Sequence, residues 1–487
     1  MSDTKQALIS GTKWTTLSTL ITNAVGIIKL SILTRLLEKS EFGLMAILSM
    51  VLEVVVTFSN LGFATAIMHK QDLTHKEFCS LYWIQFIVFG FCYLIIVSVA
   101  YPISLFYEEP QLLYMLPLAG LGIIFNSVGN FYSTVFQKNM NFKFLSTRNI
   151  IASLFSLIIA VVLAFNGFGV LSLVLSDLLN ALIFNIWNFI YGQKYFKMRF
   201  FVSFKLVKPL VKIGLYQTGT QFLDLLSSRI DIFIISKFLG TEILGMYNIA
   251  KSLVLKVVTI INGITNTVSL PYFSKIQGDE SLLRKNYLKV LNLLSHIDFP
   301  ICVVIGSMSC FIVPVLYGES YNDIIPVVSI LSIWSMLCCV GNPVGNIIKA
   351  TGQTKQSFKY TIIRMFIVFP CVLISSQYGM IWVAVFQIIS SVIASFVLWH
   401  IELWQTIRLK LKDYINSFII KFIIGLIIGG LVFSISFFLK DYIDNIIYSA
   451  LISGFLLVSL YVIVYAVFYK DMLMQLKAYV SSKIKRK

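Results

Sequence analysis

Charged residues are scarce in this sequence. Asp, Glu, Lys and Arg make up only 13% of its 487 residues, about half of the roughly 25% found in soluble domains. A soluble fold of this composition would have too few polar side chains to cover its surface. The scarcity excludes an ordinary soluble protein, and the mean hydropathy of +0.86 indicates that lipid covers the surface instead.

Residue types that bind metals or nucleotides are also rare or badly spaced. The chain has four histidines and seven cysteines, and no cysteine pair is spaced with histidines as metal ligands would be. We find no Gly-rich phosphate loop and no long polar stretch that would fold as an ATPase domain. The first apolar segment carries Lys29 and lacks a small-residue cleavage site, so it does not read as a cleavable signal. We therefore expect no metal ion and no cofactor.

Long apolar segments make up most of the sequence. A membrane-spanning helix needs about 20 apolar residues, whereas a barrel strand needs only ~10 alternating ones. The sequence predicts an all-α integral membrane protein with about 14 transmembrane helices. These predicted spans are 11–34, 42–67, 78–101, 112–136, 145–165, 169–191, 210–236, 244–270, 291–316, 324–348, 360–376, 379–401, 414–439 and 446–469.

The basic residues are distributed unevenly between the two sides. With the N-terminus in the cytoplasm, thirty of the 39 Lys and Arg residues fall on the cytoplasmic side, and only Arg35, Lys39, Lys237 and Lys440 fall on the other. Such a bias predicts that both termini are cytoplasmic. The net charge of +17 then reflects topology rather than nucleic-acid binding. We expect the basic tail at 483–487 to contact anionic lipid headgroups.

The chain contains an internal repeat at an offset of 202 residues. Gly43 aligns with Gly245 and Thr57 with Thr259. Two pseudo-symmetric six-helix lobes, residues 1–200 and 201–410, are predicted, followed by two helices and the tail at 411–487. Inverted or duplicated halves of this kind are typical of transporters.

Polar residues form matching stripes at the start of each lobe. Residues spaced by three and four lie on one face of a helix. The first span has Thr15, Thr19, Thr22, Gly26 and Lys29, and the seventh has Gln217, Gln221, Asp224, Ser228 and Asp231.

Ten ionisable residues lie well inside predicted spans, away from the span ends: Lys29, Glu53, Asp177, Asp224, Arg229, Asp231, Lys251, Lys256, Asp298 and Lys421. A lipid-facing charge at mid-helix costs roughly 2.5–3.5 kcal/mol, so most of these must face a wet or paired interior. Residues on the stripes favour a cavity lining. Helix–helix salt bridges and snorkelling side chains remain the alternatives.

Several short motifs resemble one family. They are Leu37-Glu38-Lys39-Ser40-Glu41-Phe42-Gly43, the stretch from Asp231 to Ala250, and Ala350-Thr351-Gly352-Gln353-Thr354. The chain resembles the polysaccharide transporter branch of the multidrug/oligosaccharidyl-lipid/polysaccharide exporter superfamily, most closely the colanic and teichuronic acid exporter type. Lys39 stands where this family often has proline.

The resemblance implies a flippase in a bacterial cytoplasmic (inner) membrane. It would move an undecaprenyl-diphosphate-linked oligosaccharide to the periplasmic leaflet by alternating access, with membrane lipids and polysaccharide polymerase or assembly proteins as further partners. Lys29, Arg229, Lys251 and Lys256 are the candidates to bind the diphosphate. Candidates for coupling to a proton or sodium ion are Glu53, Asp224, Asp231 and Asp298.

Two other functions stay open. A small-molecule or drug antiporter of the same superfamily would usually have twelve spans, two fewer than predicted here. A membrane enzyme such as a glycan polymerase would usually display catalytic residues in a sizeable external loop, and the predicted external loops are short.

Overall fold

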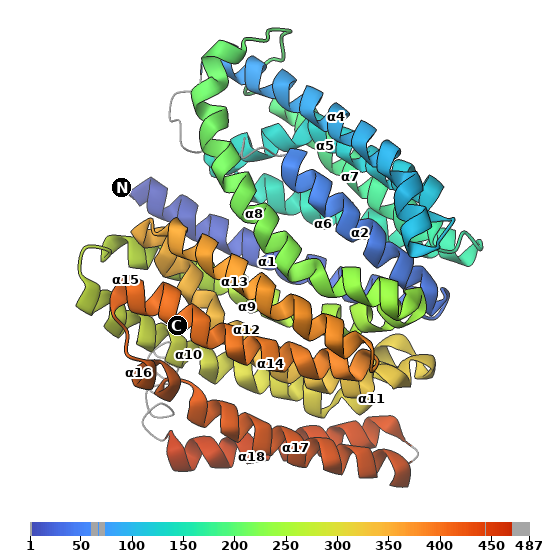
Figure 1. Ribbon diagram of the computed structural model, residues 1–487, viewed down its shortest axis with the longest axis vertical. Coiled ribbons are helices and arrows are strands. Elements are labelled where there is room, and N and C mark those ends of the chain that lie inside the picture. Colours follow the sequence, from blue (N-terminus) through green and yellow to red (C-terminus); the bar gives the residue numbers. More distant parts are fainter. Residues whose placement is uncertain (1, 60–66, 68–73, 444, 470–487) are drawn as a thin grey trace.

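A computed structural model describes residues 2–59, 67, 74–443 and 445–469, and the regular structure within these residues is helical (Figure 1). The basic tail at 483–487 lies outside the described residues. The first seven helices, among which no α3 is labelled, are α1 (Ser2–Leu33), α2 (Lys39–Ser59), α4 (His75–Tyr107), α5 (Leu112–Lys138), α6 (Phe142–Phe165), α7 (Leu171–Gly192) and α8 (Phe204–Phe238). The others are α9 (Gly240–Lys275), α10 (Glu280–Ser307), α11 (Ser309–Tyr317), η1 (Glu319–Ile324), α12 (Ile325–Thr351), α13 (Thr354–Ser376), α14 (Met380–Leu398), η2 (Trp399–Trp404), α15 (Gln405–Ile407), α16 (Leu411–Asn416), α17 (Ile419–Tyr442) and α18 (Ile446–Phe468).

Thirteen of the fourteen predicted spans coincide with helices long and apolar enough to cross a membrane, counted over the described residues. The remaining span, 210–236, falls in α8, a helix of 35 residues. Such a helix is about 52 Å long at 1.5 Å per residue, more than enough for a bilayer. It is not counted among these thirteen apolar helices because its sequence mixes ionisable residues with apolar ones.

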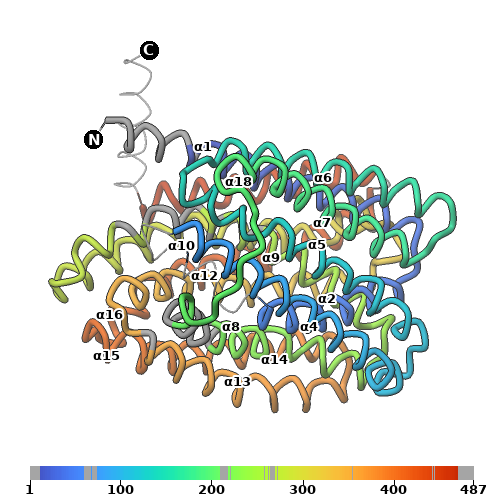
Figure 2. The backbone as a smooth tube through the Cα atoms, turned by 90° about the horizontal axis from the view of Figure 1, so that it is seen from above, coloured from blue at the N-terminus to red at the C-terminus, as the bar shows by residue number. Residues whose placement is uncertain are grey.

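The helices form two groups and an attached pair. In the first group, here called the N lobe (α1–α7), α5 packs on α7 and α1 on α6. In the second, here called the C lobe (α8–α15), α9 and α10 pack on α12, and α13 packs on α14. The attached pair, α17 and α18, contacts the C lobe mainly through α10 and lies along one edge of the molecule (Figure 1). α8 packs on α13 of its own lobe and on α2 and α4 of the N lobe, and Figure 2 shows it from above near α4 and α13. The predicted boundaries at residues 200 and 410 stay a prediction.

Large apolar side chains cover the outside of the bundle. They are prominent on α4, where Phe91 is 64% exposed, and on α18, where Phe455 is 77% exposed. An apolar exterior of this extent is stable only against lipid. The chain is therefore a multi-pass membrane protein.

Glycines in the sequence explain two of the turns between helices, whereas one predicted span is divided into two helices. The short turns after α6 and α13 contain Gly167, Gly169 and Gly379, each with positive φ, a backbone conformation that glycine adopts without strain. The ninth predicted span, 291–316, is wrong as a single helix. The α-helix continues through Pro300 to Ser307, and a new helix, α11, begins at Ser309.

Two glycines bring the lobes into backbone contact. A Cβ added to Gly43 in α2 would lie 1.9 Å from the carbonyl oxygen of Thr241 in α9. One added to Gly245 in α9 would lie 2.0 Å from the carbonyl oxygen of Lys39 in α2. The offset of 202 residues that pairs Gly43 with Gly245 also pairs Lys39 with Thr241, so the two contacts are reciprocal, as at a two-fold axis.

Candidate functional site

A polar cavity of about 380 Å³ lies within the N lobe, between α1, α6 and α7. Its lining residues are Thr22, Val25, Gly26, Lys29, Asn149, Ser153, Ser156, Asp177, Asn180 and Phe184. Three of the five residues in the predicted first-span stripe are among them. The other two, Thr15 and Thr19, donate hydrogen bonds of 2.9 Å to backbone carbonyls one turn earlier.

Lys29 is the cation in the wall of this cavity. Its ammonium group lies 2.9 Å from a carboxylate oxygen of Asp177, and it donates hydrogen bonds to Ser176 at 2.8 Å and Ser156 at 3.1 Å. The Lys29 side chain is 16% exposed and that of Asp177 is 51% exposed. Because the carboxylate is open to solvent, another anion can approach Lys29 and compete with it.

Lys256 reaches the same region from the C lobe. A Cβ added to Gly26 would lie 3.6 Å from the Lys256 ammonium nitrogen, and Gly26 lies one turn before Lys29 on α1. No described acidic residue forms an ion pair with Lys256. The structure thus brings together Lys29 and Lys256, one from each lobe.

Arg229 and Glu53 bridge the lobes elsewhere. Arg229 on α8 donates two hydrogen bonds to the carboxylate of Glu53 on α2, at 2.7 and 2.6 Å. Two-pronged pairs of this kind fix the relative orientation of the two side chains. Both side chains are partly open, at 33% and 39% exposed. A predicted substrate cation and a predicted coupling carboxylate therefore neutralise each other.

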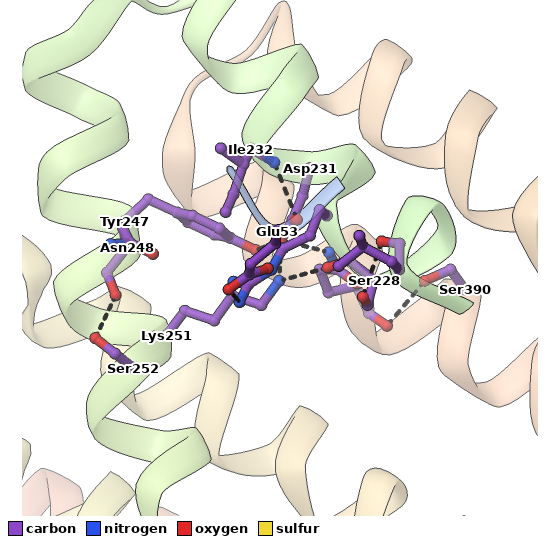
Figure 3. Close-up of polar contacts among 12 residues, drawn as sticks. Glu53, Ser228, Asp231, Ile232, Tyr247, Asn248, Lys251, Ser252 and Ser390 are labelled. Atoms are coloured by element: carbon purple, nitrogen blue, oxygen red, sulfur yellow. Dashed lines mark hydrogen bonds and ion pairs between the residues drawn. The ribbon is translucent and has the colours of Figure 1, made fainter. Parts of the chain in front are cut away.

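Lys251 and Asp231 form a buried ion pair inside the C lobe (Figure 3). The same carboxylate oxygen accepts hydrogen bonds from the Tyr247 hydroxyl at 3.0 Å and the Gln387 amide at 3.3 Å. The other oxygen accepts the backbone N–H of Ile232 at 3.0 Å. Asp231 is saturated with donors, and Lys251 has its counterion. Neither residue of the pair lines the cavity, and its burial and full set of partners favour a structural role.

The remaining two predicted coupling carboxylates lie apart from each other. Asp224, on the exposed face of α8 with Gln221 and Ser228, accepts a 2.7 Å hydrogen bond from the hydroxyl of Thr361. Asp298 on α10 is 1% exposed, and one of its oxygens has no hydrogen-bond partner. The side chain of Gln217, from the same stripe as Asp224, lies outside the described part.

Arg148 and Glu402 are buried ionisable residues that the sequence analysis did not single out. Arg148 lies in α6 and is 2% exposed. Glu402, in the π-helical segment η2, is 4% exposed. Arg148 lies three residues inside the predicted span 145–165, and this position could have identified it as an intramembrane charge.

Polar contacts tie the lobes together at the end of the bundle that holds the α1–α2 turn. Arg35 donates to the backbone carbonyls of Val315 and Leu316 at 2.8 and 3.2 Å. Further contacts join Lys39 to Asp323 at 3.3 Å, Lys237 to Glu108 at 3.2 Å, and Thr241 to Glu109 at 2.8 Å. Together with the reciprocal glycine contacts, they hold this end closed.

Solved structures of membrane transporters share this fold. The lipid II flippase MurJ in an inward closed conformation superposes with a TM-score of 0.74 at 16% identity, covering 94% of this chain and 99% of that one. A multidrug resistance MATE family transporter in an inward-facing conformation gives a TM-score of 0.60 at 14% identity, covering 80% of this chain and 95% of its own. At these identities the likeness concerns the fold.

Relatives found by sequence have higher identity to this chain than these solved structures do. The lipopolysaccharide biosynthesis protein WzxC of Escherichia coli is 26% identical over 402 residues, 81% of each chain. The teichuronic acid biosynthesis protein TuaB of Bacillus subtilis is 25% identical over 422 residues, 85% of this chain and 86% of its own. The family profile described as polysaccharide biosynthesis protein matches residues 32–326, more than half of the chain. The chain belongs to this family, within the polysaccharide transporter branch of the multidrug/oligosaccharidyl-lipid/polysaccharide exporter superfamily.

Proposed function

We propose that this protein is a flippase for an undecaprenyl-diphosphate-linked oligosaccharide in polysaccharide biosynthesis. It carries the diphosphate and its glycan from the cytoplasmic to the periplasmic leaflet of the bacterial inner membrane, with both termini in the cytoplasm. The relatives that act in lipopolysaccharide and teichuronic acid biosynthesis support this substrate class.

One observation carries the proposal: cations from both lobes meet beside a polar cavity in the membrane-spanning part of the chain. Lys29 lines the cavity and Lys256 reaches the α1 turn that precedes it. Charges in a low-dielectric interior attract an anion far more strongly than the same charges in water. A diphosphate is the anionic part of the proposed cargo, and the hydroxyl and amide groups around the cavity suit glycan oxygens.

Exchange of ion pairs gives the cargo a way to change the conformation. A diphosphate that binds Lys29 competes with Asp177, and one that binds Arg229 competes with Glu53. The second competition weakens a bridge between α2 and α8, and so between the lobes. A ligand shifts a conformational equilibrium only through such differences in contacts between states.

Among the four predicted coupling carboxylates, coupling to an ion is assigned to those that no described cation neutralises. Asp231 is saturated and Glu53 is paired, which leaves Asp224 and Asp298. A proton that binds Asp298 removes a buried negative charge, whereas the exposed Asp224 is open to a proton or a sodium ion. Either event can return the empty transporter to its starting state.

The test is flipping of a lipid-linked oligosaccharide in sealed vesicles that contain the purified protein. Lys29→Ala and Lys256→Ala each remove a charged hydrogen-bond donor worth about 1.5–3 kcal/mol, so each should slow transfer about tenfold or more. Lys410→Ala is the matched control, because Lys410 is exposed and does not line the cavity.

Wild-type rates in both cavity variants would contradict the cationic site. A wild-type protein that transfers no lipid-linked oligosaccharide but exports cationic dyes would favour the drug antiporter instead. The fold gives that alternative less support, since the MATE transporter covers 80% of this chain and the flippase MurJ covers 94%.

A further inference from the structure

Arg148 is a buried cation that no described carboxylate neutralises. Its guanidinium donates to the side-chain oxygen of Asn188 and, at 2.8 Å, to that of Asn149. The guanidinium carbon also lies 3.5 Å from the centre of the Phe184 ring. Burying a charge without a counterion is costly, even when it is hydrogen-bonded. Such a residue calls for a reason beyond packing.

The neighbours of Arg148 connect it to the polar cavity. Asn149 and Phe184 both line that cavity, directly in front of the guanidinium. An arginine side chain has donors and no acceptor. Asn149 must therefore turn its side-chain oxygen toward Arg148, and two hydrogen bonds hold it there, at 3.3 and 2.8 Å.

This orientation decides what Asn149 offers to a ligand. Its oxygen is occupied, and no described residue accepts a hydrogen bond from its amide nitrogen. The two N–H groups are left for the cavity. Lys29, on the opposite helix, has its three N–H groups engaged by Ser156, Ser176 and Asp177, and its charge is matched by Asp177. The Asn149 amide is therefore a donor left for a ligand in this wall, and Arg148 and Lys256 leave the surroundings of the cavity with a surplus of positive charge.

We propose that Arg148 is a positioning residue that turns Asn149 into a hydrogen-bond donor for the diphosphate of the cargo. This inference rests on the proposed function and assigns a further specificity-determining residue to it. The surplus positive charge favours the diphosphate oxygens over neutral sugar hydroxyls as the acceptors, because hydrogen bonds to charged groups are about twice as strong.

Asn149→Asp tests the donor directly. It keeps the shape of the side chain and gives Arg148 a counterion, so the fold is retained, but it replaces the N–H groups by an acceptor oxygen. We expect farnesyl diphosphate, a short prenyl diphosphate without a glycan, to bind the purified protein at least about tenfold more weakly. The control Asn166→Asp adds the same charge in the exposed turn between α6 and α7. Unchanged binding in Asn149→Asp, or an equal loss in the control, would overturn the proposal.

A second pair of variants tests the positioning role. Arg148→Lys keeps the charge but loses the fork that holds Asn149, and it should weaken farnesyl diphosphate binding severalfold in the wild-type background. In an Asn149→Ala background the same change should have little effect, since the oriented donor is already absent. Equal losses in both backgrounds would mean that Arg148 acts only through packing or charge.

Binding of a free oligosaccharide and transfer across vesicle membranes are measured separately from diphosphate binding. If Asn149→Asp instead weakens only a free oligosaccharide and leaves farnesyl diphosphate unaffected, the assignment to the diphosphate is wrong. Vesicle transfer by the wild-type protein reports on the proposed function alone. The two ideas therefore fail in distinguishable ways.

Discussion

At the scale of single residues, the exposed fraction of the side chains separates the intramembrane ion pairs that the structure describes. The Lys251 and Asp231 side chains are 7% and 1% exposed, whereas Arg229 and Glu53 are 33% and 39% exposed. Removing one partner of a buried pair leaves an uncompensated charge and costs about 3–5 kcal/mol. Partly exposed pairs contribute about 0–1 kcal/mol.

Asp231→Asn should therefore destabilise the protein by about 3–5 kcal/mol, because it leaves the Lys251 ammonium buried without a counterion. Glu53→Gln is the matched carboxylate-to-amide change at the more exposed pair, and it should cost about 1 kcal/mol or less. Thermal unfolding of the detergent-solubilised protein measures both. Similar losses for the two variants would show that burial does not distinguish these pairs.

Sequence patterns located the intramembrane charges but not their partners. Lys29 and Asp177 are far apart in the chain, and so are Glu53 and Arg229. Which charges pair depends on how the helices pack, and helical periodicity carries no information about that. The cationic patch was thus predicted as four residues, whereas the structure brings two of them together. Arg148 was overlooked because it lies near the end of its span.

At the scale of helices, apolar length was the reliable signal. Thirteen predicted spans match suitable helices, since the cost of exposing backbone in lipid leaves few other arrangements. The break between α10 and α11 was missed because residues on both sides are equally apolar. Pro300, the residue in this span that disrupts helices most, lies inside α10, and the helix ends seven residues after it.

The α2–α9 crossing depends on the absence of side chains at Gly43 and Gly245. Gly43→Ala and Gly245→Ala would each push a methyl group into the backbone of the other lobe. We expect either change to open the α1–α2 end of the bundle, and the reciprocal geometry predicts similar effects for both. Faster hydrogen–deuterium exchange in residues 34–41 and 237–241 would report the opening.

Gly90→Ala on α4 is the control for this pair. A Cβ there meets nothing within 4 Å, and alanine in a helix is favoured over glycine by about 1 kcal/mol. This variant should leave exchange at the α1–α2 end unchanged. Unaltered exchange in both Gly43→Ala and Gly245→Ala would show that the close contact does not hold the lobes together.

At the scale of the whole molecule, the contacts between the lobes are asymmetric along the bundle. Two of the three described ion pairs that join the lobes lie at the α1–α2 end, beside the reciprocal glycines. The third, Arg229 with Glu53, lies further along α2. A transporter whose lobes are held together at one end resembles one of the two states that alternating access requires. Its biological meaning depends on which side of the membrane that end faces.

The distribution of basic residues predicts that the closed end faces the periplasm. A reporter enzyme that is active only in the cytoplasm should be active when fused at either terminus. A short tag inserted at Glu109, in the turn between α4 and α5, should react with an impermeant label on intact spheroplasts. A tag at Gly278, between α9 and α10, should react only after the membrane is permeabilised. The opposite labelling pattern would place the closed end in the cytoplasm, and the structure would then be the outward-facing state of the cycle.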